Sequence, residues 1–166
     1  MNKNNDKIKH LIIKKPLKLD CGTIIENYPI AYETYGSLNS NKDNAILIFH
    51  ALTGDQFASG KNPVTKRDGW WNTIVGKNKA LDTDKYFIIC ANVLGGCMGS
   101  YGPSSLNTKT GKPFGTNFPI ITINDMVNAQ YNLLDFFEIE KLFCVIGGSM
   151  GGMQVLQFVA NYPDKS

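Results

Sequence analysis

The sequence predicts an α/β fold in which a mostly parallel sheet carries helices on both faces. Continuous apolar runs at residues 44–50, 85–91 and 141–146 are typical of short strands that are buried on both sides. Helical patterns begin near Thr122 and Ser149, so strands and helices alternate along the chain. In sheets of this kind the chemistry gathers at the carboxyl ends of the strands.

The elements before the first buried strand are expected to be antiparallel. Residues 1–15 are interpreted as a polar tail and residues 16–166 as a single domain. Within that domain, residues 16–20 and 28–35 alternate polar and apolar side chains. This pattern predicts two strands of a β-meander with one face in water.

Two helices are expected in the second half of the chain. Thr122 and Asp125 have the spacing of a capping box, which predicts a helix start at this point. The second helix runs from Ser149 to about Asn161 and is ended by Pro163. One face of the first helix is expected to pack on the sheet, and it is formed by Met126, Gln130, Leu133, Leu134 and Phe137.

The composition is that of an ordinary folded domain. The chain has 166 residues, 43% of them hydrophobic and 19% charged, which is too apolar for a disordered protein. The net charge of +3 is spread out, and the N-terminal lysines have no interleaved aromatic residues, so we expect no nucleic-acid partner. The sequence has no run of about 18 apolar residues and no signal-peptide core. We therefore expect no membrane association and a cytoplasmic location.

The four cysteines are Cys21, Cys90, Cys97 and Cys144, and none stands in a C-x-x-C motif. Cys90 and Cys144 lie in predicted strands. We therefore expect reduced thiols rather than disulfides, and no metal site.

The most informative motif is Gly147-x-Ser149-x-Gly151, which lies between an apolar strand and a helix. Such a turn forces the serine into a strained conformation, and glycine two residues before and after it avoids a clash of Cβ atoms. The pattern is typical of a nucleophile elbow, with Ser149 as the nucleophile. The N–H of Met150, at the start of the helix, is expected to be one donor of an oxyanion hole.

Two other interpretations of this turn stay open at this point. A glycine-rich turn between a strand and a helix can bind a phosphate, and Gly147-x-Ser149-x-x-Gly152 differs little from a dinucleotide fingerprint. That fingerprint needs an acidic residue about 20 positions further on, beyond the last residue, Ser166. The turn can also be purely structural. A P-loop is excluded because its Gly-Lys-Ser/Thr ending is missing.

A second candidate segment, residues 50–55, follows a buried strand. A Gly-containing loop after such a strand is where a second oxyanion donor is expected, and the N–H of Leu52 is the natural supplier. We expect His50 to support this loop by hydrogen bonding rather than to act as a general base. His10, in the predicted tail, is a still weaker candidate for the base.

Together these motifs resemble the homoserine O-acetyltransferase family, acyltransferases with the α/β-hydrolase fold. The resemblance runs from about Pro16 to Pro163 and is specific because several motifs occur in the family's order. They are residues 50–55, 69–71, 79–84, 92–97, 102–105 and 147–154. The resemblance implies the N-terminal half of an α/β-hydrolase sheet, truncated after the nucleophile helix.

The function implied by this resemblance is a two-step acetyl transfer of methionine biosynthesis. Ser149 would take the acetyl group from acetyl-CoA, and the hydroxyl of homoserine would then remove it. The N–H groups of Leu52 and Met150 would hold the oxyanion in both steps. The implied partners are these small molecules and, as in the family, a second copy in a homodimer, with no bound cofactor. Residues 92–121 resemble the wall of the family's access tunnel, or else form a surface loop.

Three departures from the family pattern are visible. Asn124 stands where the family usually has arginine, and Glu138 where it usually has glycine. If position 138 needs a left-handed conformation, glutamate costs about 1 kcal/mol there. After Ser149 the sequence has one acid, Asp164, and no histidine, so the family's catalytic aspartate and histidine have no counterpart.

Three functional hypotheses follow. The chain is part of a homoserine O-acetyltransferase and inactive alone, because loss of triad members costs roughly 10⁴–10⁶ in rate. Alternatively, it is a non-catalytic truncated remnant or an interaction partner. A third hypothesis changes the substrates, to those of a homoserine O-succinyltransferase or a serine O-acyltransferase. In each case the strand at 141–146 is expected to form an apolar edge of the sheet.

Overall fold

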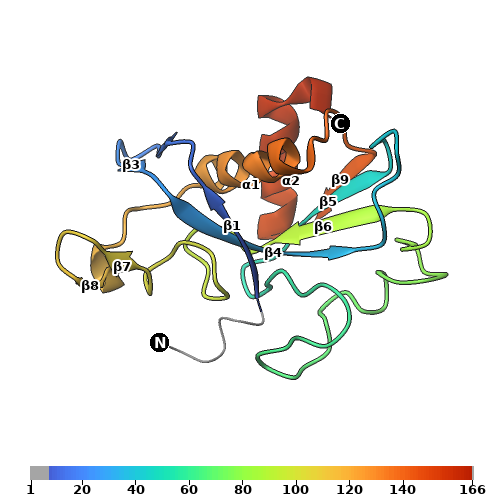
Figure 1. The fold of residues 1–166 in the computed structure, drawn as a ribbon, viewed down its shortest axis with the longest axis horizontal. Coiled ribbons are helices and arrows are strands. Elements are labelled where there is room, and N and C mark those ends of the chain that lie inside the picture. The colour runs from blue at the N-terminus through green and yellow to red at the C-terminus, as the bar shows by residue number, and fades with distance from the viewer. Residues whose placement is uncertain (1–7, 166) are drawn as a thin grey trace.

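The computed structural model describes residues 8–165 and contains a five-stranded sheet in the order β1-β4-β6-β5-β9 (Figure 1). The central strand β5 (Ala45–Phe49) lies parallel to β6 (Phe87–Ala91) and to β9 (Cys144–Gly147). On the other side, β4 (Tyr28–Tyr35) is antiparallel to both β6 and β1 (Lys9–Ile13). The strands predicted in these regions are therefore confirmed, with small shifts at their ends.

The strand β1 corrects the prediction of a polar tail over residues 1–15. It pairs with β4 along its whole length, with Leu11 opposite Ile30, and so belongs to the sheet. The reason is its apolar content, because Ile13 is buried in the core and Leu11 packs against it. The domain thus begins before residue 16, while residues 1–7 lie outside the described part of the chain.

Two short ribbons stand apart from this sheet. β2 (Leu17–Lys18) pairs with β3 (Ile24–Ile25), and β7 (Leu106–Asn107) pairs with β8 (Lys112–Pro113). The predicted meander of residues 16–20 with 28–35 is wrong in its pairing, because β1 rather than β2 takes the place beside β4. Two 3₁₀ turns, Gly115–Asn117 and Pro163–Lys165, complete the regular structure.

The helices α1 (Ile123–Phe137) and α2 (Met150–Asn161) confirm the two predicted helices. The capping box is present, because Thr122 Oγ1 accepts from the Asp125 N–H at 3.2 Å and Asp125 Oδ2 accepts from the Thr122 N–H at 2.9 Å. α1 ends at Glu138, whose φ of 55° and ψ of 42° are left-handed. The need for such a conformation at position 138 is therefore confirmed.

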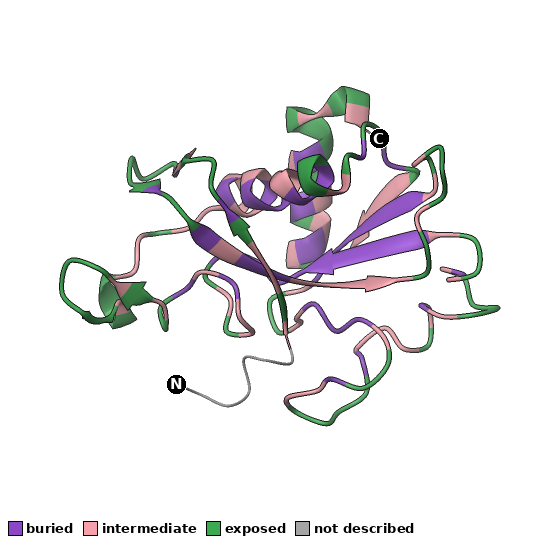
Figure 2. Cartoon of the chain, in the orientation of Figure 1, coloured by how far each residue is buried: buried purple, intermediate pink, exposed green. Residues whose placement is uncertain are grey.

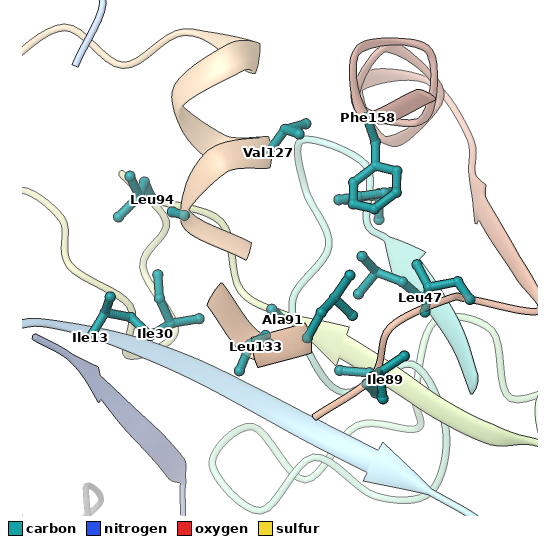
Figure 3. Close-up of a cluster of buried hydrophobic side chains, with 14 of the residues drawn as sticks. Ile13, Ile30, Leu47, Ile89, Ala91, Leu94, Val127, Leu133 and Phe158 are labelled. Carbon is teal, nitrogen blue, oxygen red and sulfur yellow. The ribbon is translucent and has the colours of Figure 1, made fainter. Parts of the chain in front are cut away.

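The two faces of the sheet are covered differently. Alternate residues such as Leu47 and Phe49 of β5 pack against α1 and α2, and Figure 3 shows Leu47 in one cluster with Leu133 and Phe158. Ile46 and Ile48 point to the opposite face, where irregular chain between β5 and β6 covers them. In residues 8–165 both helices thus share one face, which corrects the expectation of helices on both. The reason is that the covering segment is broken by glycines and packs its paired tryptophans, Trp70 and Trp71, in place of a helix.

The strand β9 forms one edge of the sheet, as predicted. Figure 2 shows β5 and β6 buried while β9 is only half-buried. Large apolar side chains near this edge are exposed. One directly precedes β9 and three lie on α2: Phe143, Met153, Leu156 and Val159. Within the described residues this is the apolar edge that the sequence indicated.

All four cysteines are free, which agrees with the expectation of reduced thiols. Burial raises the pKa of the Cys90 thiol, so it stays protonated in the core. No helix within residues 8–165 is long and apolar enough to cross a membrane.

Candidate active site

Ser149 lies at the junction of β9 and α2 in a strained conformation. Its φ is 57° and its ψ is −125°, which lies outside the left-handed helical region as well as the ordinary ones. Such a conformation at a non-glycine residue costs on the order of 1–3 kcal/mol and persists only where its surroundings impose it. The side chain makes no capping hydrogen bond to α2, and the residue is exposed. This is the geometry that the motif predicts for an elbow.

The glycines on either side of Ser149 are required by close contacts of the backbone. A Cβ on Gly147 would lie 2.6 Å from the carbonyl carbon of Gly151, and one on Gly151 would lie 2.1 Å from the carbonyl oxygen of Phe49. Real Cβ atoms do not approach so closely. Gly148, in contrast, would meet nothing within 4 Å. The prediction that glycine is needed two residues before and after Ser149 is confirmed.

The elbow lies beside the segment that follows β5. Gly147 pairs with Phe49 in the parallel register of β9 and β5, so both strands end at the same edge of the sheet. Gln154 of α2 donates from Nε2 to the backbone oxygen of His50 at 3.4 Å. The two candidate segments of the sequence are therefore brought together.

The segment after β5 forms a tight turn with Leu52 at its corner. The N–H of Gly54 donates to the carbonyl oxygen of Ala51 at 2.8 Å, and the Leu52 side chain is 77% exposed. The backbone N–H groups of Leu52 and Met150 find no hydrogen-bond acceptor within residues 8–165. Two free donors, one from each turn, thus occur at the edge where an oxyanion hole is expected.

His50 is buried behind this turn and is held by three hydrogen bonds. Its Nδ1 lies 2.7 Å from the oxygen of Ala51, and its Nε2 lies 3.2 Å from the N–H of Val93 and 3.4 Å from Nδ2 of Asn92. Burial lowers the pKa of His50, against smaller opposing effects of Ala51 and Asp55. The prediction that His50 supports the loop is confirmed.

The other candidate acid–base residues are not near Ser149. His10 lies on β1, and β1 and β9 are the two opposite edges of the sheet. Asp164 follows α2 at the end away from Ser149. In the described part of the chain, no side chain forms a hydrogen bond with the Ser149 hydroxyl. Nor is there, among residues 8–165, a cluster of three or more histidine, cysteine, aspartate or glutamate side chains suited to a metal ion.

A buried polar contact joins the two helices and was not predicted from the sequence. Gln130 of α1 donates from Nε2 to Oε1 of Gln154 at 2.8 Å, and both side chains are fully buried. Gln154 then reaches the backbone of His50, so the helices are tied to the candidate site. A signal was available, because Gln130 falls in the otherwise apolar face of its helix.

Comparison with known proteins places this arrangement in a family. A family model described as the alpha/beta hydrolase fold matches residues 44–165, and the chain therefore belongs to the α/β-hydrolase fold family. Within that family it is similar to a homoserine O-acetyltransferase of Pelagibacter ubique, at 74% identity over 98% of this chain and 44% of that protein. The resemblance to homoserine O-acetyltransferases that the motifs indicated is thus confirmed.

Solved structures give the same result. A homoserine O-acetyltransferase from Bacillus anthracis superposes with a TM-score of 0.86 at 34% identity, over 94% of this chain and 43% of that one. An esterase superposes with a TM-score of 0.84 at 37% identity, over 95% and 44%. The chain therefore spans less than half the length of the relatives it matches.

Proposed function

We propose that this chain carries the nucleophile of a homoserine O-acetyltransferase, and that this nucleophile is Ser149. The observation that supports it most is the φ of 57° at Ser149, imposed between two obligatory glycines where a strand becomes a helix. The 74% identity to the Pelagibacter ubique protein supports acetyl-CoA and homoserine as the substrates.

In the first step, Ser149 Oγ attacks the carbonyl carbon of the acetyl thioester while a base removes its proton. The carbon–sulfur bond breaks, and the CoA thiolate leaves and takes up a proton, so that an acetyl ester remains on Ser149. In the second step, the homoserine hydroxyl attacks this ester, which gives O-acetylhomoserine and the free serine. Acetyl-CoA is thus a substrate and not a resident cofactor.

Each step passes through a tetrahedral intermediate with a negatively charged oxygen. The N–H groups of Leu52 and Met150 are proposed to bind this oxygen, because they lie at the ends of adjacent strands and have no other acceptor in residues 8–165. A donor of this kind is typically worth ~10²–10³ in rate. The positive end of the α2 dipole favours the same charge.

The histidines of this chain do not supply the base in this proposal. Both ring nitrogens of His50 are already hydrogen-bonded, and His10 lies on the far edge strand. The 166-residue polypeptide by itself is therefore expected to form no O-acetylhomoserine above a Ser149→Ala control. Turnover that Ser149→Ala abolishes would show that another group of this chain completes the site. A non-catalytic role of the polypeptide alone is consistent only with the absence of turnover.

Ester hydrolysis is a second candidate, supported by the 37% identity to the esterase structure. It uses the same acetyl ester on Ser149 but takes water as the acceptor. The two activities therefore differ in whether the acyl-enzyme is protected from water until homoserine arrives.

The test uses an extended protein, formed by this chain followed by the residues of the Pelagibacter ubique relative beyond its match. With acetyl-CoA and homoserine it should form O-acetylhomoserine, and Ser149→Ala should lower the rate ~10⁴-fold or more. Succinyl-CoA as donor, or serine as acceptor, should support slower transfer. Acetate release that homoserine does not suppress would identify an esterase, and undiminished transfer by Ser149→Ala would exclude the proposed nucleophile.

Two further parts of the proposal come from the resemblance alone. The extended protein is expected to form a homodimer, which sedimentation can test. Its place is proposed to be the cytoplasm, in methionine biosynthesis.

A further inference from the structure

The N–H of Leu52 belongs to a peptide unit whose other end is held firmly. In a trans peptide the carbonyl oxygen and the N–H point in opposite directions, and here that oxygen is the one of Ala51. The Ala51 oxygen accepts two hydrogen bonds, from the Gly54 N–H at 2.8 Å and from His50 Nδ1 at 2.7 Å. Because the peptide is planar, hydrogen bonds that fix the Ala51 oxygen also fix the direction of the Leu52 N–H at its opposite end.

The hydrogen bonds of His50 determine which ring nitrogen carries its proton. The Val93 N–H can only donate, so Nε2 of His50 must accept, and the Ala51 oxygen can only accept, so Nδ1 must carry the hydrogen. The ring is thus a neutral imidazole that connects the loop after β6 with the peptide before Leu52. A charged ring would lose the bond from Val93.

The position of the ring is itself restrained from several sides. Gly54 approaches it so closely that a Cβ there would lie 2.9 Å from the Cβ of His50. The Asn92 side chain contacts Nε2, and its Oδ1 accepts from the Met98 N–H at 3.2 Å. The His50 backbone oxygen accepts from Gln154, which follows the elbow in α2. The ring therefore joins the turn after β5 to the loop after β6, and its backbone joins that turn to the elbow.

We propose that His50 is a positioning residue, which aims the Leu52 N–H at the oxyanion by holding the Ala51 carbonyl with Nδ1–H. The inference rests on the proposed function, because it assumes that an oxyanion forms beside Leu52. It assigns His50 a role in the transition state without contact between its ring and the substrate.

Two substitutions separate the effect of the Nδ1 hydrogen bond to Ala51 from that of the Nε2 hydrogen bond from Val93. In His50→Asn the amide nitrogen can take the place of Nδ1 and donate to Ala51, while the contact with Val93 is lost. In His50→Gln the longer side chain can reach Val93 with its oxygen, while the donor to Ala51 is lost. Both variants remove the imidazole from the same buried site, so they share most of its packing cost. His10→Gln, the same change at the other histidine, serves as the control.

The experiment measures acetylation of Ser149 by acetyl-CoA in the extended protein, in single turnover. The amplitude counts folded sites and the rate reports the transition state. We expect His50→Gln to acetylate ~10–100-fold more slowly at unchanged KM for acetyl-CoA, and His50→Asn to stay within about fivefold of the parent. His10→Gln should match the parent in its acetylation rate and in its KM for acetyl-CoA.

Other outcomes would overturn the inference. Equal slowing in His50→Asn and His50→Gln would assign the effect to the loss of the ring and not to the bond with Ala51. If His50→Gln does not fold, a slowing of His50→Asn by more than about tenfold decides against the proposal. Normal acetylation in both variants would reject it while leaving Ser149 as the nucleophile. If the parent itself acetylates no Ser149, the proposed function fails, and the inference fails with it.

Discussion

The turns that follow β9 and β5 lie side by side, yet different interactions define them. The elbow after β9, where Ser149 has a φ of 57°, depends on close steric contacts of its glycines, because a Cβ on Gly147 would meet Gly151 and one on Gly151 would meet Phe49 of β5. The turn after β5 has no positive φ over residues 50–54 and is held by His50, whose partner Val93 is 43 positions away. One turn thus depends on steric limits at the glycines of a short motif, and the other on the hydrogen bonds of one buried side chain. The two are expected to respond to mutation in different ways.

The largest effect is expected at the glycine of the elbow that touches β5. Gly151→Ala should destabilise the extended protein by about 3 kcal/mol or more, because its Cβ would lie 2.1 Å from the Phe49 oxygen. Gly148→Ala is the matched control, and it should change the free energy of unfolding by less than about 0.5 kcal/mol, since its Cβ meets nothing within 4 Å. Urea unfolding measures both. Equal tolerance of the two alanines would show that the elbow is not fixed by this contact.

The next effect concerns the turn after β5, where the backbone and not the side chain is expected to matter. Leu52→Pro removes the N–H and should slow acetylation of Ser149 ~10²–10³-fold. Leu52→Ala keeps the N–H and truncates a side chain that is 77% exposed, so its rate should stay close to that of the parent. Acetylation rates of folded Leu52→Pro equal to the parent would exclude this donor, and the N–H of Ala51 or Thr53 would become the candidate.

A smaller effect is expected at the end of α1, where, as in the elbow, a non-glycine residue has a positive φ. Glu138 has a φ of 55°, and Glu138→Gly should be more stable than Glu138→Ala by about 1 kcal/mol in urea unfolding. Both variants lose the ion pair with Lys42, so their difference isolates the backbone. If the two variants are equally stable, the left-handed conformation carries no strain at this position.

The smallest effect is the pH dependence that His50 confers. Its pKa is lowered in the folded state by burial, from an ordinary value of 6.5, so the unfolded chain binds more protons as pH falls below that value. This contribution to stability is complete above pH 6.5 and is lost progressively at lower pH. Asp55, the charged group that acts on His50, favours the protonated ring but does not outweigh burial. Unfolding free energies between pH 7.5 and 5 should fall less steeply in His50→Asn, and identical slopes would contradict the assignment.

The same contrast explains what the sequence could predict. The elbow, the capping box at Thr122 and the left-handed conformation at Glu138 follow from short sequence patterns and steric rules, and the structure confirms all three. The apolar runs around β5 and β6 likewise predict buried strands, and both strands are buried. The run around β9 also forms a strand, but the prediction that it is buried on both sides is wrong, because β9 lies at the edge of the sheet and is only half-buried. A role of His50 as support could be predicted from its place at a strand end, but its partners could not.

The features that the sequence did not predict have a common cause. Strand β1 reads as a lysine-rich tail, because pairing with β4 is a property of two segments and not of Lys9–Ile13 alone. The covering of one sheet face by irregular chain, with Trp70 and Trp71 in place of a helix, depends on how a long segment packs. The link from Gln130 through Gln154 to His50 joins three elements that are far apart in sequence. Contacts between segments that are far apart in the chain determine these features, and such contacts are difficult to predict from a single sequence.

The elbow is proposed to present Ser149 as the nucleophile that accepts the acetyl group. The most direct test is to incubate the extended protein with acetyl-CoA in the absence of homoserine and to locate the acetyl group by peptide mass spectrometry. We expect one acetyl group on Ser149, which is lost when homoserine is added and is absent from Ser149→Ala. Transfer to homoserine that continues without an acetylated Ser149, or with the acetyl group on another residue, would contradict it.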